Sequence, residues 1–515
     1  YHPKLSSPGN CRMCLIEMGL PKMTPDRKPV LGEDGKPEIN WIPRPQISCA
    51  QDVADGMAIR TDSPMVQECR QGVMEFLLIN HPLDCPICDQ AGECRLQEFS
   101  VEYGHGESRF LEHKVKKPKN VELGPRVTLD AERCILCSRC IRFMQEVAHD
   151  DVLGFTDRGS HSTIACHPGK KLESNYSLNT VDICPVGALT SSDFRFKMRV
   201  WFLKETKTID INCGTGSNII IGSRQNVIYR ITPRENNDVN SVWLPDSHRL
   251  NFKYLTREDR LKTPMVKGEP VEWRTAIAIA AEMLKAHSAD RIALIASGRS
   301  TNEELFLIRQ LILALGIDKQ HDIVPRMGEP DGILIAADRN PNTSGAKLLK
   351  LCTTRPGSRL KKIAEGVRSR QYKVLLCLGE DATKAGLSAE DLAKLDAVIA
   401  MNILPNSTTR QATVLLPASG WAEKRGSMIN IKGRLQRLNQ AVTPPEQARD
   451  DWEIIRDLIH AVSGSNGIYA IEDVFKRMSE SIPALAGLNL SKIGDLGVPV
   501  LDIENKDAAN EEDGE

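Results

Sequence analysis

The chain has 515 residues, of which 41% are hydrophobic and 26% charged, so it can bury several cores. Its 67 Lys and Arg balance 68 Asp and Glu, and only 5% of the residues are aromatic. This composition argues against nucleic-acid binding, which needs a basic surface and favours stacking side chains. No apolar run reaches the roughly 18 residues of a membrane span, so we expect no direct membrane span.

The first half of the chain changes character several times. Its expected elements, in order, are strands at 12–18 and 57–60, a helix at 64–80, a Cys-rich loop to 103, a basic linker at 113–119, a third unit at 127–183, and short strands at 219–221 and 227–231. The helix should end before Pro82, because a residue that precedes proline disfavours helical geometry.

The second half alternates buried strands with helices. Strands are expected at 291–296, 332–336, 373–378 and 396–400, with helices at 302–315 and 388–395 between them. This alternation predicts a parallel α/β sheet. The polar and acidic end, 504–515, is expected to be a disordered tail.

Cysteine is distributed unevenly. Of 15 cysteines, all but Cys213, Cys352 and Cys377 lie before residue 185. A disulfide scaffold of this density would be short and paired throughout, so the pattern favours metal centres in a reducing compartment. Cys69 and Cys166, together with Cys352 and Cys377, are expected to have no redox role.

The most specific motif is H-x3-C-x2-C-x5-C, which begins at His81 and ends at Cys94. Thiolates are the ligands of iron–sulfur clusters, so the motif predicts a [4Fe-4S] cluster on His81, Cys85, Cys88 and Cys94. Neutral imidazole in place of one thiolate removes a negative charge and should raise the reduction potential. A structural zinc site remains the alternative on spacing alone.

A second motif, C-x2-C-x2-C, is followed at a distance by Cys184-Pro185. Bacterial ferredoxins combine such a triplet with a remote Cys-Pro. Cys166 is the one further cysteine in between, so the unit should retain a single [4Fe-4S] cluster, with a zinc ribbon as the alternative. Its ligands would be Cys134, Cys137, Cys140 and Cys184.

A third set contains Cys11, Cys14 and Cys49 and matches part of the plant-type [2Fe-2S] spacing. Three ligands leave such a cluster one short. Either the fourth ligand lies before Tyr1, or the site is not a cluster. The chain starts with neither Met nor an apolar leader, so we expect it to be a fragment of a longer product.

These three sets, in this order, resemble the large iron–sulfur subunit of bacterial NADH–quinone oxidoreductase, respiratory complex I. The similar stretches are Tyr1-His2-Pro3, Asn10 to Cys14, His81 to Asp89, Arg133 to Cys140, Leu416-Pro417-Ala418, Ala422 to Gly426, and Asn430 to Gln436. In that family the first [2Fe-2S] ligand is a Cys directly before a Tyr-His pair. The resemblance therefore places the missing ligand just ahead of Tyr1.

The resemblance implies an α+β multidomain fold. Its expected domains are a remnant of a β-grasp [2Fe-2S] ferredoxin domain (1–62, incomplete at its N-terminus), a helical His/Cys3 [4Fe-4S] domain (63–103), a ferredoxin-like [4Fe-4S] domain (104–200), a degenerate 4Fe-4S domain of the Mo/W type (201–257), a molybdopterin-oxidoreductase-like α/β domain (258–503) and the acidic tail (504–515).

The degenerate domain departs from the family pattern. Some members hold an additional [4Fe-4S] cluster there with four Cys, where this chain has Asp210, Cys213, Ser217 and Pro245. One Cys of four cannot hold a cluster, so we expect none. We also expect no molybdopterin, because Ala296 to Arg299 lacks a phosphate-binding fingerprint and the resemblance implies a domain without the cofactor.

The implied function is electron transfer within NADH–quinone oxidoreductase, coupled by the complex to proton translocation. Electrons would enter the [2Fe-2S] centre, cross the Cys134 cluster, reach the His81 cluster and continue toward quinone. We expect no catalytic residue and no cofactor-binding residue beyond the metal ligands.

The resemblance also implies partners and a location. The partners would be the NADH/flavin-binding subunit, a thioredoxin-like [2Fe-2S] subunit and a two-cluster ferredoxin-like subunit. The expected location is peripheral, on the cytoplasmic face of the bacterial inner membrane.

Three other functions share parts of this pattern. An NAD-linked iron hydrogenase would need further clustered cysteines downstream, and formate dehydrogenase would need a metal-ligating Cys in the second half. Cys213, Cys352 and Cys377 form no such motif. A zinc-stabilised assembly protein is the alternative outside redox chemistry, and metal analysis separates it from the iron–sulfur interpretation.

Overall fold

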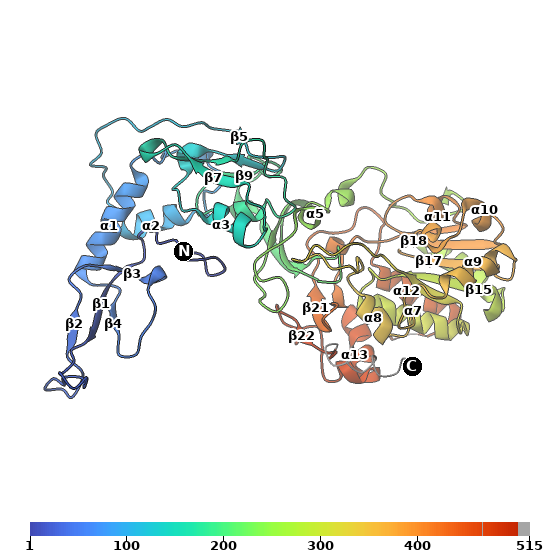
Figure 1. Cartoon of the computed structure of the whole chain (residues 1–515). Coiled ribbons are helices and arrows are strands. Elements are labelled where there is room, and N and C mark those ends of the chain that lie inside the picture. Colours follow the sequence, from blue (N-terminus) through green and yellow to red (C-terminus); the bar gives the residue numbers. More distant parts are fainter. Residues whose placement is uncertain (466, 503–515) are drawn as a thin grey trace. The chain divides into compact units, whose positions relative to one another are not determined.

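The computed structural model describes residues 1–465 and 467–502 (Figure 1). The chain divides into two compact units, Tyr1–Leu203 and Lys204–Glu515. In the described residues, every helix is too short or too polar to cross a membrane. The predicted tail at 504–515 lies outside the described residues.

The first unit starts with a small antiparallel sheet and a helix. Strand β1 (Leu15–Pro21) pairs with β2 (Ile39–Trp41), β3 (Gln46–Ile47) and β4 (Ala58–Arg60). Helix α1 (Pro64–Leu78) follows, and the hydroxyl of Ser63 caps it by accepting from the Val66 amide. The predicted helix at 64–80 is confirmed. Proline at the first position suits the start of the helix. The helix ends at Leu78, two residues before the predicted end and ahead of Pro82.

The rest of the first unit consists of short elements around loops. They are η2 (Cys85–Ile87), α2 (Arg95–Tyr103), β5 (Val121–Glu122), β6 (Val127–Leu129), η3 (Ala131–Arg133), α3 (Arg139–Glu146), β7 (Leu153–Thr156), β8 (Thr163–Cys166), α4 (Asn179–Asp182) and β9 (Leu189–Ser191). Strands β5, β6 and β9 form one sheet, and β7 pairs with β8. Phe143 and Met144 of α3 are completely buried and anchor this core.

The second unit begins with an antiparallel meander of β10 (Lys204–Ile209), β11 (Asn218–Arg224) and β12 (Val227–Pro233). The short helix α5 (Asp246–Arg249) follows. The apolar side chains of Ile209, Ile219 and Ile221 share a core with Trp421 and Met428. The meander is therefore packed against the α/β part of the same unit.

A seven-stranded sheet forms the centre of the second unit, in the order β14-β13-β19-β18-β17-β15-β16. Its strands are β13 (Met265–Val266), β14 (Glu269–Pro270), β15 (Ile292–Ser297), β16 (His321–Val324), β17 (Val374–Leu378), β18 (Ala397–Asn402) and β19 (Val414–Pro417). Strands β15 to β19 are mutually parallel, as predicted.

Helices cover both faces of this sheet, because successive side chains of a strand point to opposite sides. Leu294 packs into the core with α6 (Trp273–Lys285), α7 (Asn302–Leu315) and α12 (Asp451–Ser463). Ile295 packs on the other face with α9 (Leu360–Arg368). The remaining elements are α8 (Thr343–Leu348), α10 (Ala389–Leu392), α11 (Ser407–Arg410), β20 (Gly426–Ile429), β21 (Arg434–Leu438), α13 (Ile471–Ser481) and β22 (Val498–Pro499).

The strand predicted at 332–336 is wrong, because this segment is a loop. The carboxylate of Asp331 accepts hydrogen bonds from the amides of Ile333, Leu334 and Ile335, and Gly332 has a φ of +75°. An Asx-type turn satisfies the amides that a strand would have offered to its neighbour. Strand β16 fills the corresponding edge of the sheet instead.

A buried ion cluster holds the segment Ala422–Gly426. Lys424 is 6% exposed, and its Nζ lies 2.7 Å from Glu304 Oε1 and 2.9 Å from Asp451 Oδ2. Burial opposes the charge on Lys424, but Asp451 and Glu304 raise the pKa of the amine above its usual value. Next to it, Arg425 pairs with Glu472 on the surface.

We predict that Lys424→Met destabilises the second unit by about 3–5 kcal/mol, because it leaves two carboxylates buried without a cation. Denaturant unfolding of this unit measures the effect. The control is Arg425→Met, which removes an exposed ion pair and should cost less than about 1 kcal/mol. Equal effects of the two variants would contradict the importance of the buried cluster.

Candidate metal centres

The His81 set lies on the loop between α1 and α2. Cys85 begins η2, the Cys88 amide donates to the Cys85 carbonyl at 3.1 Å, and Cys94 directly precedes α2. The basic linker holds the start of this loop, because the Lys114 amine donates to the carbonyls of Leu78 and Ile79 at 2.8 and 2.9 Å. Lys114 thus satisfies carbonyls at the end of α1, where helices favour cations.

His81 has the properties of a metal ligand. Its Nδ1 is buried and has no hydrogen-bond partner in the described part of the chain. Burial, and then the positive Arg133, lowers the pKa of His81 to about 4. The ring is therefore neutral at pH 7, which is the form that binds metals. A buried ring nitrogen without a partner fits a cluster ligand at this position.

The Cys134 set surrounds the start of α3. Cys134 follows η3, Cys140 lies in α3, and Cys184 follows α4. Two non-glycine residues of the triplet loop, Leu136 and Ser138, have φ values of +55° and +58°. Each costs about 1–2 kcal/mol, and such strained residues are concentrated at functional sites.

The four thiols of this set influence one another. Burial, and then the charge of Cys137, raises the pKa of Cys184 to about 12. Burial, and then the charges of Cys184, Cys137 and Cys134, raises the pKa of Cys140 well above its usual value. Thiolates this close together in a buried site require a cation, so their chemistry fits an iron–sulfur cluster.

The Cys11 set is partly assembled. Cys14 and Cys49 share a hydrogen bond, and the Ser48 amide donates to the Cys14 carbonyl at 3.2 Å. Burial acts in the opposite direction, but hydrogen bonds from Cys49 and Ser48 lower the pKa of Cys14. Cys11 is three residues before Cys14, on a turn in which Arg12 has a φ of +62°.

Direct contacts join the His81 and Cys134 sets. The guanidinium of Arg133, the residue before Cys134, lies 2.9 Å from Asp84 Oδ2, and Asp84 precedes Cys85. The Cys94 thiol lies 3.7 Å from the Pro185 carbonyl, directly after Cys184. A Cβ atom on Gly187 would lie 2.3 Å from Cys88 Sγ. The two sets are therefore neighbours.

The Cys134 set also contacts the segment around Cys11. Asn10 Nδ2 donates to the Ser138 hydroxyl at 3.2 Å, between Cys137 and Cys140. Arg139 donates to the Tyr1 carbonyl at 2.6 Å and to the Ile183 carbonyl at 3.0 Å. The Cys134 set thus lies between the other two in a series of contacts.

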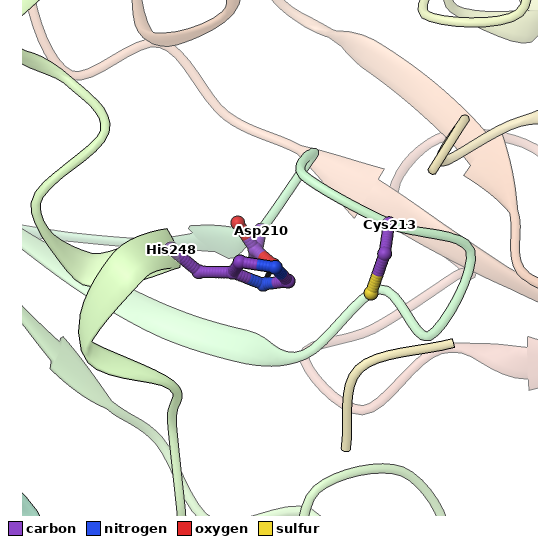
Figure 2. A group of neighbouring side chains, drawn as sticks. All are labelled: Asp210, Cys213 and His248. Atoms are coloured by element: carbon purple, nitrogen blue, oxygen red, sulfur yellow. Dashed lines mark hydrogen bonds and ion pairs between the residues drawn. The ribbon is translucent and has the colours of Figure 1, made fainter. Parts of the chain in front are cut away.

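Sequence reasoning missed one gathering of ligand-type side chains. His248 lies with Asp210 and Cys213, and all three are buried (Figure 2). The one signal for His248 in the sequence is its position in the region where the family pattern expects a further ligand. Cys166, for which the sequence offers no partner, donates to the Leu123 carbonyl at 3.3 Å.

A unit with three thiol-rich loops, followed along the chain by a two-faced α/β domain, fits an iron–sulfur electron-transfer protein. Family models match four segments of the chain. They are the NADH-ubiquinone oxidoreductase-G iron-sulfur binding region (70–109), the ferredoxin-like domain of NADH-quinone oxidoreductase subunit 3 (124–190), the 4Fe-4S domain of the NDSU1/NuoG-like type (203–253) and molybdopterin oxidoreductase (321–461).

Proteins similar to this chain are named as components of NADH-quinone oxidoreductase or of NADH dehydrogenase. The G subunit of NADH-quinone oxidoreductase from Rickettsia felis is 31% identical over 96% of this chain and 87% of its own length. Subunit 3 of Thermus thermophilus is 42% identical over 60% of this chain and 42% of its own. The mitochondrial NADH dehydrogenase [ubiquinone] iron-sulfur protein 1 of Solanum tuberosum is 42% identical over 61% and 40%.

The chain belongs to the family of the NADH-quinone oxidoreductase G subunit. It is an electron-transfer subunit with 4Fe-4S domains followed by a molybdopterin-oxidoreductase-like domain. A chain of an NAD+-reducing [NiFe]-hydrogenase also matches, with 24% identity over 39% of this chain and 76% of its own and a TM-score of 0.31. That score is too low to support an argument.

We predict that Gly187→Ala disrupts the His81 cluster, because the new methyl group would overlap Cys88 Sγ. A sulfur atom bound to iron cannot move away, whereas a free thiol can. Iron should fall by about four atoms per chain, the content of one cubane. The control is Gly72→Ala in α1, where a Cβ meets open space and helix propensity improves. Full iron content in Gly187→Ala would show that Cys88 is not a ligand.

Proposed function

We propose that this chain holds three iron–sulfur centres in series and conducts electrons between partner subunits of NADH–quinone oxidoreductase. The proposed ligands are Cys11, Cys14 and Cys49 for a [2Fe-2S] centre, His81, Cys85, Cys88 and Cys94 for one [4Fe-4S] centre, and Cys134, Cys137, Cys140 and Cys184 for the other. When bound, such clusters supply reversible one-electron transfer. A [2Fe-2S] centre needs four ligands, so the three cysteines of this set leave one ligand to be supplied.

One observation carries this proposal: the three sets are linked by contacts in the order that the electron path requires. Asn10 contacts Ser138 at one end, and Arg133 contacts Asp84 at the other. The residues of this chain fix the ligand loops and balance charge between neighbouring sets. Electrons would enter at the Cys11 set and leave at the His81 set.

The spacing of the donor atoms disfavours the zinc alternative for these sets. Among the described residues, three ligand-type side chains bring their donor atoms within 4.8 Å of one another at Asp210, Cys213 and His248. The proposed ligand sets do not converge this closely. Four ligands of one zinc ion must converge at least as closely, because Zn–ligand bonds are only about 2.0–2.3 Å long. A cubane holds each ligand on a different iron and therefore spreads the ligands apart.

The surface next to the His81 set supports a protein partner at the exit. Leu83 and Ile87, on either side of Cys85, are 68% and 63% exposed, and Phe76 of α1 is 76% exposed. Apolar side chains gathered on a surface mark protein interfaces. We infer that the two-cluster ferredoxin-like subunit docks there. The NADH/flavin-binding subunit and the thioredoxin-like subunit would lie near the Cys11 set, with the complex bound peripherally at the cytoplasmic face of the membrane.

The α/β half is proposed to have a structural role without molybdopterin. Its sheet leaves a cavity of about 420 Å³ at the carboxyl ends of the parallel strands, lined by Ser297, Arg299 and Glu380 among others. Arg326 Nη2 lies 2.6 Å from Glu380 Oε2, and Lys424 is paired with Asp451. Two of the basic groups at this cavity are thus neutralised by the protein itself, which weakens its attraction for a phosphate-bearing cofactor.

Metal analysis tests the proposal directly. Anaerobically purified chain that includes the upstream ligand should contain roughly ten iron and ten sulfide atoms, two from the [2Fe-2S] centre and four from each cubane. We predict that Cys137→Ala lowers the iron content by about four atoms. The control is Cys166→Ala, which removes a nearby thiol bound to a carbonyl and should leave iron unchanged. Colourless protein, or equal iron in both variants, would refute the ligand assignment.

A second prediction concerns the imidazole ligand. His81→Cys should retain a cluster but lower its midpoint potential by roughly 100 mV, because an additional thiolate stabilises the oxidised form. Redox-titrated electron paramagnetic resonance measures this potential, with the Cys134 cluster of the same protein as the internal reference. An unchanged or higher midpoint would refute the argument that the charge of the ligand sets this potential.

A further inference from the structure

Three side chains of different metal-binding chemistry meet inside the second unit (Figure 2). Asp210 and Cys213 lie on the loop between β10 and β11, and His248 lies on α5. The loop is closed at its base, where the Asp210 amide donates to the Ser217 carbonyl at 2.8 Å. The exposed fractions of Asp210, Cys213 and His248 are 3%, 1% and 9%. Two separate elements therefore deliver a carboxylate, a thiol and an imidazole to one buried point.

Neighbouring residues orient the carboxylate and the imidazole. Asp210 Oδ2 lies 2.7 Å from His248 Nδ1. Asn212 Nδ2 donates to Asp210 Oδ1 at 2.5 Å, and Asn251 donates to Asn212 Oδ1 at 2.5 Å. Partners of this kind, one shell out, fix the orientation of ligands in protein metal sites.

The Cys213 thiol interacts with Thr215 and with the backbone of Ala336 as well as with a carbonyl group. Cys213 Sγ lies 3.9 Å from the Leu334 carbonyl oxygen. The Thr215 hydroxyl donates to the same oxygen at 2.6 Å. Burial, and then the negative Asp210, raises the pKa of Cys213.

We propose that Asp210, Cys213 and His248 bind one divalent, thiophilic metal ion such as zinc. A thiolate and a carboxylate balance the two positive charges of the ion, and the imidazole binds without a charge. The loaded site is then neutral, as burial requires. Cys, His and Asp are all zinc ligands, and three-residue zinc sites complete their coordination with a water molecule.

The arrangement of the three side chains needs only small changes to hold the ion. Zinc bonds of about 2.0–2.3 Å place tetrahedral ligand atoms roughly 3.3–3.8 Å apart. The donor atoms of the three side chains already lie within 4.8 Å of one another. The one contact that must lengthen is the 2.7 Å contact between Asp210 and His248. It can lengthen because the proton that joins the two atoms leaves when the metal binds.

This site is independent of the electron path proposed above. The matching family model describes residues 203–253 as a 4Fe-4S domain, and Cys213 is the one cysteine in that range. A cubane cannot be held here, whereas a single ion needs fewer and closer ligands. The failure of either proposal leaves the other intact, because zinc and iron are measured separately.

The test uses the complete chain, purified anaerobically, loaded with zinc sulfate and desalted. Elemental analysis should find about one zinc per chain. Zinc K-edge X-ray absorption should show one sulfur at about 2.3 Å and nitrogen or oxygen at about 2.0–2.1 Å. A spectrum at the zinc edge contains no signal from iron. It is recorded on the unaltered chain, so the result does not depend on whether a variant folds.

Variants assign the ligands. Cys213→Ser should abolish the sulfur signal, and His248→Gln should reduce bound zinc to near zero, with iron unchanged in both. Asn212→Ala, which frees the carboxylate, should weaken zinc binding 10- to 100-fold. The control is Cys352→Ser, another buried thiol of this unit, which should retain the zinc. Zinc without a sulfur ligand, zinc unaffected by Cys213→Ser, or no bound zinc would each overturn the proposal.

Discussion

The ion pair between the buried Arg133 and the half-buried Asp84 is the contact on which the arrangement of the two larger ligand sets depends. Arg133 is 5% exposed and also lies 3.2 Å from Asp130. Removal of a carboxylate partner would leave the buried guanidinium of Arg133 without compensation and would cost free energy. The pair therefore resists separation of the loops that carry Cys85 and Cys134. Gly187 allows the same loops to approach further, since any side chain there would overlap Cys88. Electron transfer benefits from this rigidity, because ligand positions must not change with charge.

Burial of the thiols has a second consequence. The pKa of Cys134 is raised to about 11 and that of Cys184 to about 12, chiefly by burial. Without iron these groups are neutral and the core tolerates them. With iron they are thiolates, and their charge is compensated inside the same cage. Burial that tolerates the neutral thiols without a metal would therefore make the charged thiolates depend on one.

The candidate ligand sets could be proposed from sequence, because cluster ligands follow fixed local spacings, and as ligands they stay predictions. Helix α7 begins and ends where the periodicity predicts, and its capping box of Thr301 and Glu304 explains the start. The strand predicted at 332–336 failed because an aspartate turn competes with apolar composition. The contacts between ligand sets were not predictable, since Arg133 and Asp84 are 49 positions apart and only the fold brings them together. His248 was missed for the same reason, because its partners lie on a distant strand end.

The region 203–253 matches a 4Fe-4S family model but contains a single cysteine, Cys213. Its loop closes between Asp210 and Ser217 and buries Asp210 and Cys213. A buried metal site favours ligands whose negative charges balance the positive charge of the metal, whichever metal is bound. Four thiolates suit a cubane, whereas one thiolate, one carboxylate and one imidazole suit a single divalent ion. The donor spacing follows the same rule, because Asp210, Cys213 and His248 converge more tightly than either tetrad of the first unit. Ligand type and ligand spacing thus both distinguish the two tetrads, which suit a cubane, from the Asp210, Cys213 and His248 group, which suits a single ion.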